Sequence, residues 1–296
     1  MSRILQWLAV SLIALMSTAV CAQDKYFDSN GVRIRYLDQG SGQPIVLIHG
    51  YTSNVERSWM DTGVFANLVK DYRVIALDCR GHGKSDKPRD PRAYGGEMGQ
   101  DVVRLLDLLK IARAHIVGYS MGGNITAQLL TTNPDRFITA TLGGASGRRE
   151  AWGAQSEQAA EEEAVELENG IPFRSLILRI APIDEPKPTD EAIRQRSQAM
   201  VAVNDTAALA AFMRGRRTQL VTDAQMAAVQ VPTLGIVGSA DPNLTGMNSL
   251  KTIWPGLKVI IIEGATHAGE RGAQRRPEFV NAIREFITDH MQTSSH

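Results

Sequence analysis

The residues of this sequence best suited to chemistry form a serine flanked by glycines, Gly118–Tyr119–Ser120–Met121–Gly122, with Gly123 directly after. This stretch lies between a short apolar run at residues 115–117 and an apolar helical pattern that begins near Ile125. A serine on a sharp strand-to-helix turn exposes its hydroxyl, and such a turn requires small neighbours. The same five residues also fit a plain glycine-rich turn with a solvent-facing serine, so other parts of the chain must decide.

A serine hydroxyl is a weak nucleophile unless a base takes its proton, and that base needs an acidic group to orient it. In a parallel sheet, such groups come from the loops at the carboxyl ends of the strands. His267 follows the last strand-like run at residues 258–262, and Asp241 follows the preceding run at 234–237. The order Ser120, Asp241, His267 is that of enzymes with a nucleophile elbow. Considered alone, Asp241 could instead be a turn residue, and His267 could be an exposed loop residue.

The elements that must position these residues alternate along the chain. Apolar runs at 45–48, 73–77 and 115–117 are typical of strands buried on both faces, and residues 98–111 have the spacing of an amphipathic helix. Strands that alternate with helices predict right-handed βαβ units and a mainly parallel sheet. Near the start, the Asn-Gly pair within residues 28–31 predicts a hairpin between two strands.

The alternation stops between residues 147 and 218, where no strand pattern is found. This segment contains three helical patterns, at residues 157–168 and in runs that begin near Thr189 and Asp205. A proline-rich loop lies at residues 182–188. We predict that residues 147–218 are a helical lid inserted into an α/β core formed by 23–146 and 219–296.

The lid carries apolar side chains that could face a substrate: Ile171, Phe173, Leu176, Ile180, Met200, Phe212 and Met213. Their mostly aliphatic character predicts an apolar pocket without a charged anchor. The alternative is that the same residues pack the lid onto the core.

The bulk composition is that of a globular enzyme. The chain has 296 residues, of which 43% are hydrophobic and 22% charged, and its formal net charge is zero. This balance gives no support to binding of nucleic acid or of an acidic membrane surface. A small neutral substrate is compatible with this balance but not implied by it, and the oligomeric state is not encoded in any recognisable pattern.

The N-terminus resembles a secretory signal. Arg3 supplies the positive charge, Leu8 to Met16 the apolar run, and Val20–Cys21–Ala22 a small-residue cleavage site. We predict a signal peptide over residues 1–22, cut after Ala22, a periplasmic or secreted location, and no membrane span in the mature chain. A retained anchor and a lipid-modified Cys21 are the alternatives. Cleavage would leave Cys79 as the one cysteine, so the mature chain could form no internal disulfide.

Further motifs accompany the serine. His49–Gly50–Tyr51 is similar to an HG-x oxyanion loop, Asp78–Cys79–Arg80–Gly81–His82–Gly83–Lys84–Ser85 to a D-x-R-G-H-G-x-S stretch, and Pro277–Glu278–Phe279 to the start of a last helix. With the ordered Ser, Asp and His, these residues make the mature chain resemble the α/β-hydrolase superfamily over essentially its whole length. The resemblance implies a doubly wound, mostly parallel eight-stranded sheet of the α/β-hydrolase fold with an inserted helical lid.

The resemblance also implies roles for individual residues. Ser120 would be the nucleophile, His267 the general base and later the acid, and Asp241 the carboxylate that fixes the imidazole tautomer. The backbone N–H groups of Tyr51 and Met121 would form the oxyanion hole, where donors of this kind each contribute about 3–4 kcal/mol.

The remaining candidates are assigned structural roles. We expect His49 to order its loop, His82 to belong to a tight turn, and His115 to be structural, with Cys79 a small buried residue. The side chain of Tyr51 either adds a hydroxyl donor or an aromatic wall to the pocket, or only its backbone matters.

The expected function is that of an exported serine hydrolase that cleaves small to medium carboxylic esters or lactones through an acyl-serine intermediate. Relatives that open epoxides or displace halides carry an aspartate at the position of Ser120, which disfavours those reactions. No metal-binding or phosphate-cradling motif is found, so no metal and no cofactor are expected. The alternatives are a C–C bond hydrolase, a haloperoxidase-like perhydrolase with the same triad, or a weakly catalytic ligand-binding protein.

Overall fold

The computed structural model describes residues 23–147 and 153–292. The predicted signal peptide at 1–22 lies outside these ranges, as do residues 148–152 of the predicted lid. The strands are β1 (Lys25–Asp28), β2 (Arg33–Gln39), β3 (Pro44–Ile48), β4 (Arg73–Leu77), β5 (Ala114–Tyr119), β6 (Phe137–Gly143), β7 (Thr233–Gly238) and β8 (Lys258–Ile262).

The α-helices are α1 (Val64–Leu68), α2 (Gly96–Leu108), α3 (Met121–Thr132), α4 (Ala154–Asn169), α5 (Arg174–Arg179), α6 (Asp190–Val201), α7 (Thr206–Gly215), α8 (Asp223–Ala227), α9 (Leu244–Ile253) and α10 (Pro277–Gln292). Short helical turns are η1 (Glu56–Met60), η2 (Pro91–Ala93), η3 (Pro134–Arg136), η4 (Arg216–Thr218) and η5 (Ala273–Arg275). None of the helices within the described ranges is both long enough and apolar enough to cross a membrane.

The eight strands form one sheet in the order β1-β2-β4-β3-β5-β6-β7-β8. The pairs β1–β2 and β2–β4 are antiparallel, and all the other neighbours are parallel. The predicted hairpin joins β1 to β2, with Asn30 and Gly31 both at positive φ, as a tight two-residue turn requires. The predicted doubly wound, mostly parallel, eight-stranded sheet is therefore confirmed.

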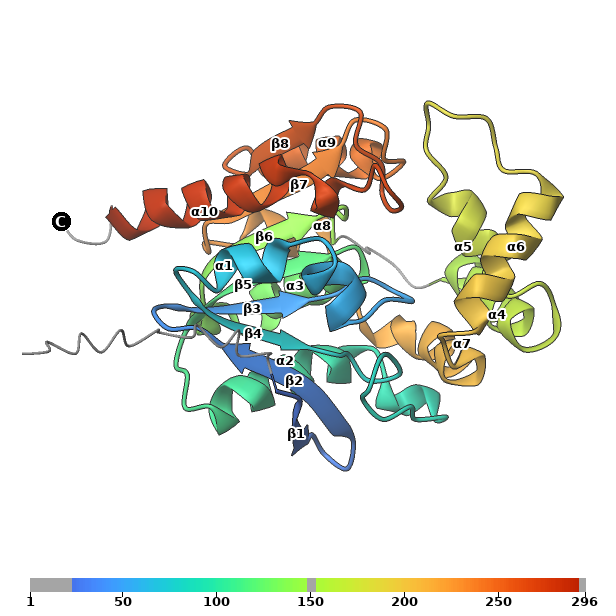
Figure 1. Cartoon of the computed structure of the whole chain (residues 1–296), viewed down its shortest axis with the longest axis horizontal. Coiled ribbons are helices and arrows are strands. Elements are labelled where there is room, and N and C mark those ends of the chain that lie inside the picture. Colours follow the sequence, from blue (N-terminus) through green and yellow to red (C-terminus); the bar gives the residue numbers. More distant parts are fainter. Residues whose placement is uncertain (1–22, 148–152, 293–296) are drawn as a thin grey trace, which may run out of the picture.

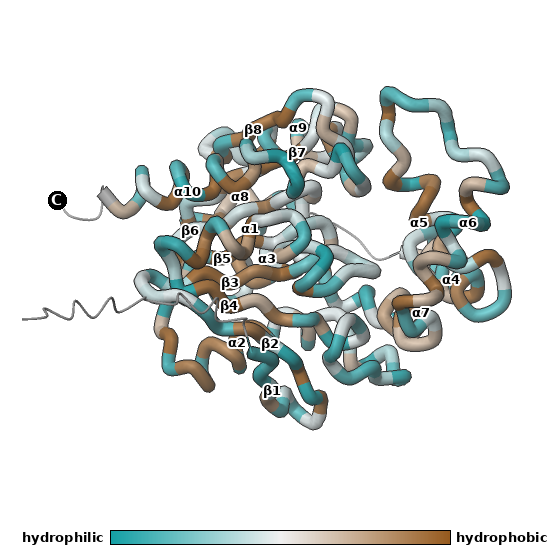
Figure 2. The backbone as a smooth tube through the Cα atoms, viewed as in Figure 1, coloured by the Kyte–Doolittle hydropathy of each residue, from teal (hydrophilic) through white to brown (hydrophobic). Residues whose placement is uncertain are grey.

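Helices cover both faces of the sheet, and successive side chains of the inner strands alternate between them. On β3, Leu47 packs with α1 and α10 on one face, whereas Val46 packs with α2 and α3 on the other. The helices α2, α3, α8 and α9 follow one another across this second face (Figure 1). Because both faces are covered, the inner strands are mostly apolar, as the brown colour of the central strands shows (Figure 2).

The predicted break in the alternation is present between β6 and β7. Here the chain forms α4 to α7, which lie together beside the sheet rather than on either of its faces (Figure 1). The side chain of Thr189 caps α6 by accepting a hydrogen bond from the Ala192 N–H, and that of Asp205 caps α7 by accepting one from the Ala208 N–H. The short helix α5 was not predicted.

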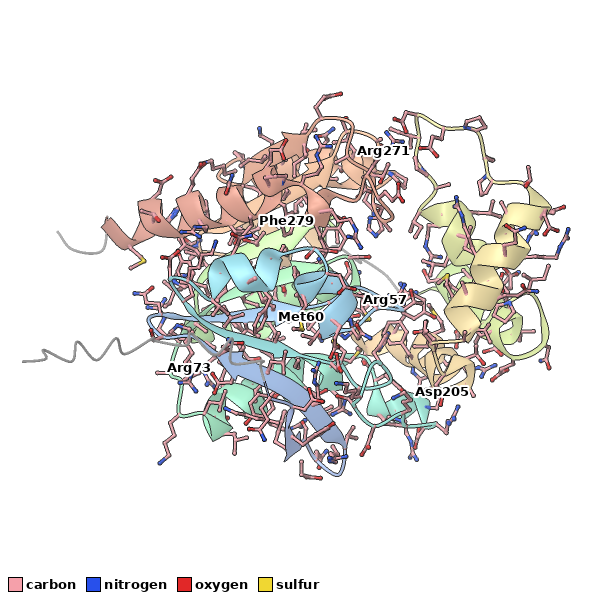
Figure 3. All side chains as sticks on the ribbon, viewed as in Figure 1. Arg57, Met60, Arg73, Asp205, Arg271 and Phe279 are labelled. Atoms are coloured by element: carbon pink, nitrogen blue, oxygen red, sulfur yellow. The ribbon has the colours of Figure 1, made fainter. Side chains whose placement is uncertain are left out.

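Asp205, which is labelled in Figure 3, also joins this helical segment to the core, because its carboxylate pairs with Arg89 at 2.5 and 2.7 Å. We expect Asp205→Ala to lower the free energy of unfolding by about 1 kcal/mol through loss of the helix cap. Asp205→Asn keeps a good cap and loses only the ion pair, which is exposed on the arginine side, so a change below about 0.5 kcal/mol is expected. Urea unfolding of both variants measures the difference. Equal losses would mean that the ion pair, and not the cap, is the stabilising contact.

Candidate active site

Ser120 occupies the turn between β5 and α3, and its backbone has φ +54° and ψ −110°. These angles are sparsely populated for a residue with a side chain, and a hydrogen bond of 2.7 Å from the Ser120 N–H to the Gly143 carbonyl holds the turn. A Cβ atom on Gly118 would lie 2.1 Å from the Gly122 carbonyl oxygen, and one on Gly122 would lie 2.0 Å from that of Ile48. The two flanking glycines are therefore required by space at a turn that projects the serine hydroxyl outward.

The structure brings the three predicted side chains into one chain of hydrogen bonds. The Ser120 Oγ lies 2.9 Å from the His267 Nε2, and the His267 Nδ1 lies 2.8 Å from the Asp241 Oδ2. Asp241 is fully buried and His267 almost so. The carboxylate selects the tautomer with a proton on Nδ1, which leaves the Nε2 lone pair to accept the serine hydroxyl. An imidazole held in this way can take the hydroxyl proton when the oxygen attacks a carbon.

Two residues that the sequence did not single out hold this arrangement in place. The Asn243 N–H donates to the Asp241 Oδ1 at 2.8 Å, and the Asn243 side chain donates to the Gly144 carbonyl at 2.9 Å. The Tyr119 hydroxyl donates to the backbone carbonyl of His267 at 2.7 Å. An aspartate that accepts from the N–H two residues later is a recognisable turn signal, so Asn243 could have been found from the Asp-Pro-Asn sequence.

The predicted oxyanion donors lie on either side of the serine. Met121 is the first residue of α3, so its N–H has no carbonyl of the preceding turn to bind. On the other side, a Cβ atom on Gly50 would lie 3.4 Å from the Cβ of Ser120, which places the loop of Gly50 and Tyr51 against the serine. His49 orders this loop, because its Nδ1–H donates to the Gly50 carbonyl at 2.7 Å and its Nε2 accepts the Cys79 N–H at 3.0 Å.

The other histidines of the central sheet region are buried and neutral. Burial lowers the pKa of His49 to about 4 and that of His82 to about 3, and the pKa of His115 to about 4. His115 bridges Thr139 and Gln43, as a structural residue would. Burial also raises the pKa of the free Cys79 thiol, so the nucleophilic thiolate is scarcely formed at neutral pH.

These buried histidines predict an acid-sensitive fold. We expect the free energy of unfolding to fall as the pH drops from about 6.5 to about 5, because the unfolded chain then binds protons that the folded protein excludes. The pKa values of His49 and His82 lie below this window in the folded protein. Each of them therefore contributes up to about 2 kcal/mol to the loss at pH 5.

Urea unfolding at several pH values measures this loss. Burial raises the pKa of the Asp78 and Asp101 carboxyls, which act in the opposite direction, so the histidine share must be isolated by substitution. We expect His82→Phe to give a shallower fall of stability with pH than the unchanged protein. The same slope in His82→Phe and the unchanged protein would contradict the burial argument.

Two cavities meet at the serine, with volumes of about 270 Å³ and about 260 Å³. The walls that they share are formed by Tyr51, Ser120, Leu176, Ile180 and His267. The larger cavity extends along the loops of the core, and we call the smaller one, which extends under α5 and α7, the inner cavity.

The seven apolar residues of the predicted lid divide between the two expected roles. Leu176, Ile180, Phe212 and Met213 line a cavity with Ser120. Phe173 is buried within the apolar core, and Ile171 and Met200 pack against that core. The Phe212 ring stacks on the Tyr51 ring with 5.2 Å between centroids, so Tyr51 contributes an aromatic wall in addition to its backbone.

The prediction of an uncharged pocket was wrong. The inner cavity is lined by Arg179 and Arg216 as well as by apolar side chains. Neither arginine stood out in the sequence, because charged side chains ordinarily face solvent. The tertiary structure places both of them in the lining of the same cavity as Ser120.

Comparison with known proteins agrees with this geometry. A model of the alpha/beta hydrolase fold matches residues 43–212. A Bacillus subtilis (strain 168) protein named "Putative 2-succinyl-6-hydroxy-2,4-cyclohexadiene-1-carboxylate synthase" is 26% identical over 270 residues, which are 88% of this chain and 96% of that protein.

Among solved structures, Est816, described as an N-acyl homoserine lactone degrading enzyme, is 27% identical with a TM-score of 0.67, over 88% of this chain and all of its own. A thermophilic esterase from Thermogutta terrifontis has a TM-score of 0.73 at 21% identity, over 91% of this chain and 99% of its own, which shows the common fold. The chain belongs to the α/β-hydrolase fold family, as the match over more than half of its length shows. Membership supports hydrolytic chemistry for this protein.

Proposed function

We propose that the protein is a serine hydrolase that cleaves small to medium carboxylic esters or lactones through an acyl-serine intermediate. The observation that carries this proposal is the hydrogen-bonded chain from Ser120 through His267 to Asp241, placed where two cavities meet. The likeness to an N-acyl homoserine lactone degrading enzyme supports a lactone as one form of the substrate.

The geometry assigns each step to a named atom. The Ser120 oxygen attacks the substrate carbonyl while its proton passes to the His267 Nε2, and Asp241 stabilises the imidazolium through Nδ1. The Tyr51 and Met121 N–H groups would bind the oxyanion. The tetrahedral intermediate collapses, the leaving alcohol takes the proton from His267, and the acyl group stays on Ser120. Water then attacks the acyl carbon by the same route and releases the acid.

Within this proposal, residues 147–218 act as a lid over a core of residues 23–146 and 219–296. The loop before α6 contacts the end of the core that carries the histidine. Arg271, in the loop after His267, pairs with Asp184 at 2.8 Å, and the Ile183 N–H donates to the Ala240 carbonyl at 3.1 Å (Figure 3). We also propose export to the periplasm or the medium, which rests on the sequence of residues 1–22 alone.

A substrate screen tests this function. We expect hydrolysis of 4-nitrophenyl esters with an optimum among short and medium acyl chains, because each cavity is only about 260–270 Å³ in volume, and hydrolysis of simple lactones. The Ser120→Ala variant supplies the background rate. Failure to hydrolyse any ester or lactone above that background would contradict the proposal. Turnover of a vinylogous diketone in place of esters would favour a C–C bond hydrolase, and formation of a peracid would favour a perhydrolase. Binding of a ligand without turnover would favour a ligand-binding protein.

A further inference from the structure

The inner cavity has the reacting serine on one wall and two guanidinium groups on another. The Arg179 guanidinium forms a two-bond ion pair with Glu163, at 2.9 and 3.1 Å. Glu163 is buried, yet half of the Arg179 side-chain surface is accessible. Because a guanidinium carries five N–H groups, Arg179 keeps donors for a further acceptor in the cavity.

Arg216 adds a second positive charge to the same space. Its guanidinium lies 5.9 Å from the centre of the Phe212 ring and 3.2 Å from the Met213 sulfur. Burial lowers the pKa of Arg216, while the negative charge of Glu163 acts to raise it. Among the described residues that line this cavity there are two arginines and no aspartate or glutamate, so a carboxylate on a ligand would meet two guanidinium groups there.

Two neutral donors in the same cavity have no hydrogen-bond partner among the described residues. The Tyr51 hydroxyl and the Gln219 side-chain nitrogen are both buried without a hydrogen bond. Gln219 is only 3% exposed, so water does not compensate its nitrogen from outside the protein. An unsatisfied buried donor costs about 1–3 kcal/mol, and an acceptor supplied by a ligand would recover this cost.

We propose that the inner cavity binds a carboxylate carried by the substrate itself, so that the enzyme prefers anionic esters or lactones to neutral ones. This inference rests on the proposed hydrolase function and adds the substrate class. A carboxylate offers two oxygens to the Arg179 and Arg216 guanidinium groups and to the donors of Tyr51 and Gln219. Because Ser120 lines the same cavity of about 260 Å³, the scissile carbonyl and the carboxylate belong to one compact molecule.

Matched pairs of esters test the preference. The first pair places the charge on the acyl side: mono-4-nitrophenyl glutarate against 4-nitrophenyl pentanoate. The second pair places it on the alcohol side: 4-acetoxybutyrate against butyl acetate, followed by pH-stat. In at least one pair, we expect kcat/KM to favour the anionic ester about 10- to 100-fold, which is the range for a charged hydrogen bond.

The variants assign this preference to the cavity. We expect Arg216→Gln to reduce the ratio of anionic to neutral kcat/KM about 10-fold or more, mostly through KM. The matched control Arg217→Gln removes an exposed charge at the neighbouring position, outside the cavity, and keeps the ratio. If Arg216→Gln does not fold, Gln219→Glu serves in its place, because it keeps the size and opposes an anion. Equal rates for both members of each pair, or a ratio unchanged in the cavity variants, would overturn the proposal.

Calorimetry separates this inference from the hydrolase proposal. Glutarate should bind the unchanged protein saturably, pentanamide should not, and Arg216→Gln should lose the glutarate signal. Hydrolysis of neutral esters without glutarate binding would overturn the carboxylate site and leave the hydrolase proposal intact. Glutarate binding without hydrolysis of any ester would overturn the hydrolase proposal and leave the carboxylate site intact. Absence of glutarate binding and of ester hydrolysis would overturn both proposals.

Discussion

Replacement of Ser120 by alanine is expected to lower kcat for 4-nitrophenyl ester hydrolysis by at least about 10⁴-fold. The Oγ atom that lies 2.9 Å from the His267 Nε2 is then missing, so no acyl-enzyme can form. Residual activity would come from water in the site and from the oxyanion donors of Tyr51 and Met121, which the substitution leaves in place. KM should change far less than kcat, because the walls of both cavities remain.

The control for this loss is a serine away from the site. Ser249→Ala, on α9, should keep the rate of the unchanged protein. Urea unfolding should show that Ser120→Ala is about as stable as the unchanged protein, because the substitution keeps the backbone hydrogen bond to Gly143 and removes only the side-chain hydrogen bond to His267. Retention of most ester hydrolysis in Ser120→Ala would place the nucleophile elsewhere.

The second large effect is expected for Asp241→Asn, which should lower kcat about 10³- to 10⁴-fold. The side-chain oxygen of Asp241 now receives the proton of the His267 Nδ1 at 2.8 Å. An asparagine amide placed there can donate to Nδ1 and so favours the tautomer with the proton on Nε2. That nitrogen then no longer accepts from the serine, and the base is lost although the shape of the site is kept.

The position of the carboxylate makes the Asp241→Asn test specific. Its other oxygen accepts the Asn243 N–H, a contact that the amide oxygen of asparagine can keep, so the loop should stay folded. Asp184→Asn provides a matched control at an exposed carboxylate outside the hydrogen-bonded chain and should change kcat less than about threefold. Similar rates for Asp241→Asn and Asp184→Asn would mean that another group orients His267.

Much of the sheet could be predicted because its signals are local. The apolar runs that became β3, β4 and β5 are buried on both faces, so their hydrophobicity needs no partner to be recognised. The glycines at 118 and 122 also follow from a local cause, since a Cβ atom at either would collide with backbone oxygens. The order of Ser120, Asp241 and His267 then predicted which residues would meet, and the structure brings them within hydrogen-bond distance.

The rest of the site depends on contacts between distant segments. The hydrogen bond from Tyr119 to the His267 carbonyl joins residues that are 148 positions apart, and no local pattern reports it. Arg179 and Arg216 were missed for the same reason, since they line the cavity of Ser120 only in the folded chain, in which α5 and η4 meet residues far away in the sequence. The charge of the inner cavity, and with it the substrate preference that we infer, was therefore beyond the reach of the sequence.

The most direct test of the central claim is the site of covalent labelling by a fluorophosphonate, which forms a stable adduct with an activated serine oxygen. Peptide mass spectrometry of the labelled protein should find the adduct on Ser120, at a stoichiometry of about one per chain. The adduct should be absent from Ser120→Ala and slow to form in Asp241→Asn, because activation depends on the hydrogen-bonded chain through His267. An adduct on another residue, or unmodified Ser120 in protein that hydrolyses esters, would contradict the assignment of Ser120 as the nucleophile.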